Sequence, residues 1–289
     1  MDYIFHLLIA ISIYGILAVS LNYVAGYTGI LSLSHATFYG IGAYATAILT
    51  QSHGFGFISS LLIGVAATAI IAWLASYPLL KMKGDAFLLV SLGFAIIMYN
   101  VMLNWDGLTH GPLGIKGVMA PTIFGISFSS KPAFFALILG ALALTYLFFQ
   151  FIVRSPYGTI IKGIRENPTV TSVNGHPVLG YQRSVFVLGA IFAAIAGSFA
   201  ATFFQFIEPK LFNLMPYSVL ILIMVILGGL GNMKGAIIGA AILILVPEFL
   251  RFAGFPHAII GELQQIVYGC ILVTLMYFRP EGLFGEYKI

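Results

Sequence analysis

Charged residues are scarce in this chain. Asp, Glu, Lys and Arg make up 8% of its 289 residues, whereas hydrophobic residues make up 60% and the mean hydropathy is +1.04. A soluble domain carries about 25% charged residues. Because no soluble core could bury this much apolar surface, lipid must replace water around most of the chain. The composition therefore predicts an all-α, polytopic integral membrane protein.

Cysteine is nearly absent as well. Cys270 is the one cysteine, so a disulfide within the chain is impossible, and we interpret it as a small buried hydrophobic side chain in an apolar run. No second histidine or cysteine stands at ligand spacing from His35, so we expect no metal site there.

A nucleotide-binding motif is also missing. The chain has no G-x-x-x-x-G-K-[ST] segment, and "GGLGNMKG" has the wrong spacing for one, so we expect no ATP and no other cofactor on this chain. The 13 basic residues form no basic stripe; most fall between apolar runs, which argues against nucleic acid as a partner.

Nine apolar runs are candidates for membrane-spanning helices, each of which needs about 20 residues. The first has neither a basic segment before it nor a small-residue cleavage site after it, so we interpret it as a span and not a signal peptide. We treat residues 1–289 as a single transmembrane domain. The runs are 4–24, 34–50, 57–80, 86–103, 132–153, 183–206, 214–230, 235–253 and 259–278.

Basic residues fall in alternate connections between these runs, which sets the orientation. We expect residues 81–85, 154–182 and 231–235 and the C-terminus in the cytoplasm, and the N-terminus outside. The segment 104–131 is then extracytoplasmic. Because it is rich in Gly and Pro, we expect an ordered loop or short helices there and not a separate domain.

The cytoplasmic segment 154–182 contains helix signals at close spacing. Ser155 suits an N-cap and Pro156 the first helical position, so a short helix can run to about Glu166. Asn167 and Pro168 repeat the start signal, and a second helix can run to Asn174. Gly175 suits a left-handed stop. Two rigid helices favour a docking surface, although a solvated connector is the alternative interpretation.

Two glycine-rich segments interrupt the apolar pattern, and we expect broken helices at both. They suggest two related halves that face a shared translocation path. Asn22 could instead cap a helix end, and His35 could be a hydrogen-bonded structural residue. Gly40 and Gly42 suit close helix packing. The path candidates are Asn22, Gly26, Gly29, Ser32, Ser34, His35, Gly228, Gly229 and Gly231.

Ionisable residues in the apolar runs are functional candidates by default. Glu248 has Arg251 three residues on, which favours an ion pair near the outer membrane face over an ion-coupling role. Glu208 and Lys210 flank Pro209 in an outer turn, where a solvated turn competes with docking of a solute-delivery protein. Catalytic groups do not converge in the sequence, so we do not expect an enzyme.

The segment "GIRENPTVTSVNGHPV" resembles the cytoplasmic coupling segment of bacterial ABC importer permeases of the branched-chain amino acid type, the LivH/LivM family. Three further blocks resemble the same family in the same order: "GYTGILSLSHATFYGIGAY", "DGLTHGPLGI" and "VILGGLGNMKGAIIGAAILILVPEFLR". The outer loop and the tail "FRPEGLFG" favour the LivM-like subunit over the LivH-like one.

The resemblance implies a non-catalytic permease subunit in a bacterial inner membrane. Its partners would be a LivH-like second permease subunit, two cytoplasmic ATPase subunits that bind the ATP, and an extracytoplasmic solute-binding protein. Branched-chain amino acids lead the implied solutes, with urea, amides and related organic acids behind them. An ion-coupled secondary transporter or channel is the alternative. The implied coupling residues are Gly163, Ile164, Arg165, Glu166, Asn167, Pro168 and Gly175.

Overall fold

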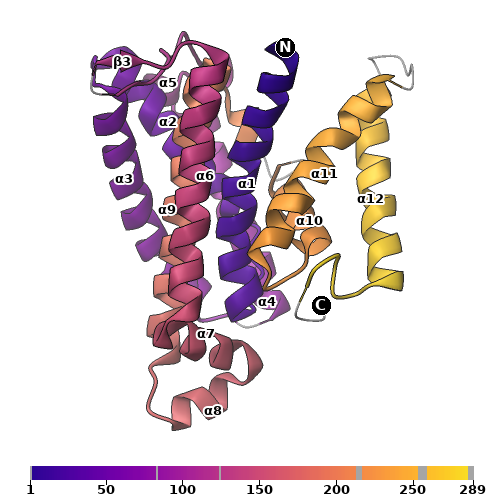
Figure 1. Ribbon diagram of the computed structural model, residues 1–289. Coiled ribbons are helices and arrows are strands. Elements are labelled where there is room, and N and C mark those ends of the chain that lie inside the picture. The colour runs from indigo at the N-terminus through magenta and orange to yellow at the C-terminus, as the bar shows by residue number, and fades with distance from the viewer. Residues whose placement is uncertain (1, 83, 124, 213–216, 253–258, 286–289) are drawn as a thin grey trace.

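The computed structural model describes residues 2–82, 84–123, 125–212, 217–252 and 259–285. Long helices account for most of these residues and run roughly along one common direction (Figure 1). The long helices are α1 (Asp2–Thr28), α2 (His35–Ser52), α3 (Phe57–Leu79), α4 (Asp85–Asn104), α6 (Lys131–Arg154), α9 (Val178–Phe204), α11 (Met233–Phe252) and α12 (Ile260–Phe278), and α10 (Val219–Gly228) is shorter.

Seven of these helices are long and apolar enough to cross a membrane, which confirms the all-α, multi-span fold class. Each of the nine predicted runs contains a helix, but two of those helices fall short. Helix α10 has only 10 residues, and α2, with 18, is too polar over its length. The predicted number of nine spans is therefore not confirmed.

The core forms around α1, α2 and α9. Helix α1 is buried continuously from Ser12 to Thr28, and α9 covers both α1 and α2. A Cβ atom on Gly42 would overlap the backbone of Ala194, and one on Gly197 would overlap the carbonyl of Tyr39. Glycine therefore lets the α2 and α9 backbones touch, as small residues do in membrane helix pairs. This confirms the predicted packing role of Gly42.

The short elements gather at opposite ends of the bundle (Figure 1). One end, where the N-terminus lies, carries the predicted 104–131 loop, whose described residues form short elements as expected. Strand β1 pairs antiparallel with β4, with Ile115 opposite Ile207, and so ties this loop to the end of α9. The elements here are α5 (Asp106–Thr109), η1 (Gly111–Leu113), β1 (Ile115–Lys116), β2 (Thr122–Ile123), β3 (Ile126–Ser127), β4 (Phe206–Ile207) and η2 (Pro209–Phe212).

The other end carries α7 (Pro156–Glu166) and α8 (Pro168–Val173), which lie beyond the lower ends of α6 and α9 in Figure 1. Helix α9 begins at Val178, so residues 178–182 of the predicted cytoplasmic segment 154–182 are helical. Pro177 stands at the N-cap of α9, so the helix starts five residues earlier than its apolar pattern does.

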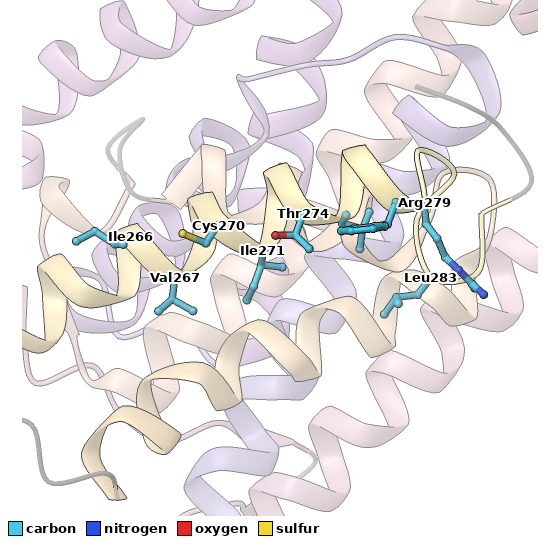
Figure 2. A pocket seen from close by; sticks show the side chains of 9 residues that line it. Ile266, Val267, Cys270, Ile271, Thr274, Arg279 and Leu283 are labelled. Atoms are coloured by element: carbon cyan, nitrogen blue, oxygen red, sulfur yellow. The ribbon is translucent and has the colours of Figure 1, made fainter.

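Helix α12 packs on α11 and α10 and leaves one side open (Figures 1 and 2). An apolar groove of about 560 Å³ runs along it, lined by Ile266, Cys270, Thr274 and, from the chain beyond α12, Leu283. Cys270 is exposed in this groove, so its interpretation as a buried side chain is wrong. The apolar run around Cys270 therefore belongs to a helix surface that faces lipid or another chain, and not to a packed interior.

Candidate functional site

The two glycine-rich segments of the predicted translocation path meet at the C-terminal half of α1. Asn22, fully buried in α1, bonds to the turn between α10 and α11. Its Nδ2 donates to the carbonyl of Asn232 at 2.7 Å and, more weakly, to that of Gly229 at 3.4 Å. Its Oδ1 accepts from the backbone N–H of Gly231 at 3.0 Å. Asn22 thus satisfies backbone groups of the second glycine cluster.

The two glycines of the first cluster have different roles. Gly29 lies just after the end of α1 with a φ of 72°, a left-handed conformation that favours glycine, and its N–H donates to the carbonyl of Ala25 at 3.1 Å. Gly26 lies inside α1, so the prediction that it breaks the helix is wrong. A Cβ atom there would overlap Asn22 Oδ1 and the Gly231 nitrogen, so Gly26 instead lets the α10–α11 turn approach α1.

His35, the first residue of α2, makes the hydrogen bond that one of its two interpretations predicts. Its Nε2 lies 2.8 Å from Ser20 Oγ of α1, and both side chains are buried. Gly189 of α9 lies beside the ring: a Cβ atom there would be in ordinary contact with His35 Cε1, at 3.7 Å, but would overlap Val24 Cγ2 of α1. Nothing in the sequence around His35 indicated Ser20 or Gly189 as its neighbours.

Ser32 and Ser34 hold the short connection between α1 and α2. Their hydroxyl oxygens lie 2.8 Å apart, and both side chains are buried. The backbone N–H of Leu33 donates to Ser91 Oγ of α4 at 3.1 Å. The connection is therefore covered by protein over most of its length, which is the condition for irregular backbone in a membrane protein.

The tail after α12 covers the second glycine cluster, a contact that no sequence signal indicated. Leu283 N–H donates to the carbonyl of Leu227 at 2.9 Å, and Phe284 N–H donates to that of Gly228 at 3.1 Å. These bonds satisfy carbonyls at the C-terminal end of α10. Gly229 has a φ of 108°, and the tail backbone passes directly against its α-carbon.

The predicted path residues therefore lie in one region, but they are packed against protein. Apart from the exposed Gly29, they are buried, and the groove in Figure 2 contains none of them. Their role in a translocation path stays a prediction. The residues concerned are Asn22, Gly26, Ser32, Ser34, His35, Gly228, Gly229 and Gly231.

The helix pair α7–α8 forms as its capping residues predict. Ser155 Oγ accepts from Gly158 N–H at 3.5 Å at the start of α7. Asn167 Oδ1 accepts from the N–H groups of Thr169 and Val170 at 3.0 and 3.1 Å at the start of α8. Gly175 has a φ of 84°, which confirms the left-handed stop.

The coupling residues differ in their exposure. Ile164 is buried, Gly163 packs near Thr171, and Arg165 turns towards α1, where its Nη1 donates to the carbonyls of Ala25, at 3.2 Å, and Gly26. Glu166, Asn167 and Pro168 are exposed.

Two apolar side chains on α8 face outward as well. Val170 and Val173 are 55% and 81% exposed and lie one helical turn apart. No sequence signal singled out these valines. Helix α7 itself is held on α9, because Tyr157 Oη lies 2.5 Å from Ser184 Oγ. Burial raises the pKa of the Tyr157 hydroxyl, so it stays protonated in this contact.

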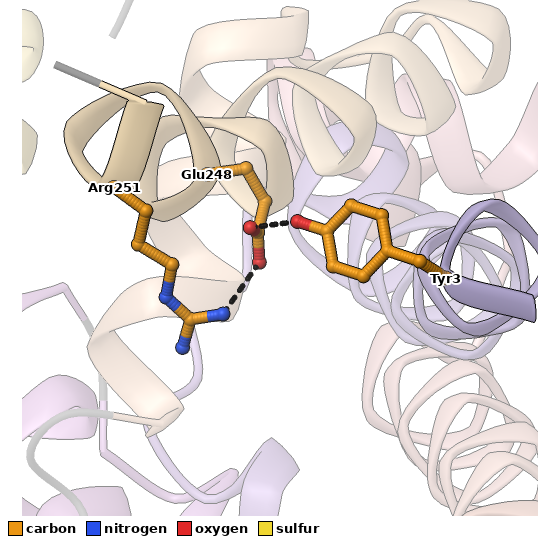
Figure 3. Close-up of polar contacts among 3 residues, drawn as sticks. All are labelled: Tyr3, Glu248 and Arg251. Atoms are coloured by element: carbon orange, nitrogen blue, oxygen red, sulfur yellow. Dashed lines mark hydrogen bonds and ion pairs between the residues drawn. The ribbon is translucent and has the colours of Figure 1, made fainter.

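Glu248 forms the predicted ion pair near the opposite end of the bundle. Arg251 Nη1 lies 3.2 Å from Glu248 Oε1, and the Tyr3 hydroxyl of α1 donates to Oε2 of the same carboxylate (Figure 3). The contact joins the beginning of α1 to the last turns of α11. Tyr3 is a partner that the sequence did not reveal, because it lies 245 positions away.

Glu208 lies between β4 and η2, and Lys210 lies within η2, at the end that carries the 104–131 loop. Glu208 is half-buried and Lys210 exposed. The loop beside them presents apolar side chains to the outside, with Leu113 79%, Met119 74% and Ile126 63% exposed.

Metal-ligating side chains do not gather in the part of the chain that the structure describes: no three of His, Cys, Asp and Glu come together there. The Ser20–His35 pair has the spacing of a nucleophile and base, but a hydrolase also needs a group that orients the base. The described contacts of His35 are the hydrogen bond to Ser20 and the close approach of Gly189. The Ser20–His35 pair joins α1 to α2.

Comparisons with known proteins find relatives among transport permeases. LivM, a high-affinity branched-chain amino acid transport system permease protein from Salmonella typhimurium, is 30% identical over 94% of this chain and 67% of its own length. A probable branched-chain amino acid transport permease protein LivM from Methanocaldococcus jannaschii is 25% identical over 100% of this chain and 95% of its own length. LivH from Salmonella typhimurium is 25% identical over 96% of this chain and 93% of its own length.

One solved structure is also similar. PsaBC from Streptococcus pneumoniae in complex with a Fab aligns over 96% of this chain and 91% of its own, with 16% identity and a TM-score of 0.46. The family model described as "Branched-chain amino acid transport system / permease component" matches residues 3–276, nearly the whole chain. This chain belongs to the family of branched-chain amino acid transport permease components.

Proposed function

We propose that this chain is one permease subunit of an ATP-driven importer, and that separate cytoplasmic ATPase subunits drive it through α7 and α8. The observation that carries the proposal is the shape of this helix pair. It lies beyond the long helices, packs one face on α1 and α9, and exposes Val170 and Val173 on another. Neighbouring apolar side chains on a capped, rigid helix suit a groove on a partner protein.

The solute and the other partners follow from the family. We propose branched-chain amino acids as the first candidates, with urea, short amides and related organic acids behind them. The complex would contain a LivH-like second permease subunit, two ATPase subunits that bind the ATP, and a solute-binding protein. LivM of Salmonella typhimurium is 30% identical to this chain and LivH is 25% identical, which favours the LivM-like position in the pair for this chain.

The proposed orientation places the α7–α8 end in the cytoplasm of a bacterial inner membrane and the N-terminus outside. The solute-binding protein would then meet the end that carries the 104–131 loop. Glu208, Lys210 and the exposed Leu113 and Met119 supply both charged and apolar groups at that surface.

Co-purification tests the contact with the ATPases. In a cell that co-expresses the permease and ATPase subunits, Val173→Asp should lower the ATPase recovered with the permease about tenfold, because it places a charge in an apolar contact. Met119→Asp is the control, since Met119 is also well exposed, at 74% against 81% for Val173, and lies at the other end of the molecule. If Val170→Asp and Val173→Asp both leave recovery unchanged, α8 does not dock an ATPase.

An ion-coupled secondary transporter is the second candidate, and Glu248 is the residue that favours it. A carboxylate in an apolar helix is the kind of group that carries protons. Its Arg251 and Tyr3 contacts, however, already occupy both oxygens. Proton-driven uptake by the purified chain alone in liposomes would establish this candidate and exclude the ATP-driven one.

A further inference from the structure

Arg165 reaches from α7 to the end of α1. Its Nη1 donates to the backbone carbonyls of Ala25 and Gly26, in the last turn of that helix. Lys162, one turn earlier on α7, lies with its Nζ 5.7 Å from the centroid of the Tyr27 ring. Two basic side chains of α7 therefore contact the same turn of α1.

The donor and the acceptors of this contact match in charge and geometry. Carbonyls in the last turn of a helix carry the negative end of the helix dipole and accept from groups outside the helix, and the carbonyl of Ala25 accepts from both Gly29 N–H and Arg165. A guanidinium is a planar, permanently charged donor, which suits them better than a flexible ammonium does. Gly29 follows α1 in a left-handed conformation and lies beside the aliphatic part of the Arg165 side chain. A Cβ atom built on Gly29 would lie 3.5 Å from Arg165 Cγ.

Helix α1 continues the connection into the bundle. Asn22 lies one turn before the Arg165 contact, and its side chain bonds to the Gly229–Asn232 turn on three backbone atoms. Gly26 carries the Arg165 contact on its carbonyl and touches the same turn with its α-carbon. A displacement of α7 that moves this turn of α1 must therefore also move the α10–α11 turn or break these hydrogen bonds.

We propose that Arg165 is a positioning residue that transmits displacement of α7 to the end of α1 and, through Asn22, to the glycine turn between α10 and α11. The inference rests on the proposed function, because ATPase subunits would supply the displacement. It assigns Arg165 to transmission within this chain and leaves the contact with the ATPase to α8.

Arg165→Met tests the proposal, because methionine keeps the apolar stem and removes the charge and the donors. The complex with the ATPases should still assemble and hydrolyse ATP, whereas solute uptake into proteoliposomes should fall about tenfold, within the range for substitutions that alter coupling between sites. Arg165→Lys keeps a donor and should recover part of the uptake. Arg154→Gln, an exposed basic residue at the same end, should change neither activity.

Two outcomes overturn the proposal. If Arg165→Met abolishes co-purification of the ATPases while the chain remains folded, Arg165 is a partner contact. If hydrolysis and uptake fall in the same proportion, it has no part in transmission. A wild-type chain that never assembles with ATPases would refute the proposed function and, with it, the source of the displacement that Arg165 is proposed to transmit.

A covalent link supplies a second test that does not depend on the guanidinium. The pair Gly29→Cys and Arg165→Cys, in a Cys270→Ser background, places two thiols on facing sides of the α7–α1 contact, where a Cβ atom on Gly29 would lie 3.5 Å from Arg165 Cγ. A side chain at the left-handed Gly29 adds strain, so the reduced double variant is the reference for the oxidised one. Uptake should rise about threefold or more on oxidation and fall again under reductant. A cross-link verified by mass spectrometry that restores no uptake would contradict transmission through this contact.

Discussion

At the residue scale, a few buried polar side chains determine where the helices meet. Asn22 is the strongest case, because one amide satisfies backbone groups on a turn more than 200 positions away, with 2.7 and 3.0 Å bonds. In an apolar environment an unsatisfied backbone group is costly. The side chain therefore stabilises both the turn and its register against α1.

Replacing Asn22 should be more damaging than its size suggests. We expect Asn22→Leu to cost about 1–3 kcal/mol, because the Gly231 N–H and the Asn232 carbonyl lose a buried partner. The measurement is the thermal midpoint of the purified protein in detergent. Asn100→Leu is the matched control, since the exposed Asn100 bonds only within its own helix, to Ile96. Equal midpoints for the two variants would mean that the Asn22 contacts carry no net stability.

At the element scale, local signals predict structure well and distant contacts poorly. The helix boundaries at Ser155, Asn167 and Gly175 follow from the side chain and backbone of neighbouring residues, so the sequence is sufficient to place α7 and α8. The contacts of Arg165 with α1 and of Tyr3 with Glu248 join residues 139–140 and 245 positions apart. No spacing rule links such residues, and only the packed fold shows that Arg165 faces inward.

The tail after α12 is an element whose importance lies in its backbone. We expect Leu283→Pro to destabilise the α10–α11 turn, because proline removes the N–H that bonds to the Leu227 carbonyl. Leu283→Ala keeps that N–H and is the control for the lost side chain. Hydrogen–deuterium exchange of the peptide that contains Gly228 and Gly229 should increase in the proline variant well beyond the alanine one. Similar exchange in both would assign the effect to side-chain packing.

At the scale of the whole molecule, the two ends differ in kind. One end is a braced loop, fixed by the β1–β4 pairing and bearing exposed apolar residues; the other is a capped helix pair, fixed to α1 and α9. An importer must meet its delivery protein on one side of the membrane and its motor on the other. The separation of the two surfaces along the bundle axis is what such a division requires (Figure 1).

The orientation can be tested with single cysteines. In a Cys270→Ser background, Leu113→Cys and Val173→Cys place thiols at sites that are 79% and 81% exposed, at opposite ends of the molecule. We expect a membrane-impermeant maleimide added outside spheroplasts of the producing cell to label Leu113→Cys. Val173→Cys should react only in inverted vesicles, because basic loops stay in the cytoplasm. The reverse pattern would turn the molecule over and place α8 out of reach of any cytoplasmic ATPase, so this experiment decides the orientation and tests a condition of the proposed function together.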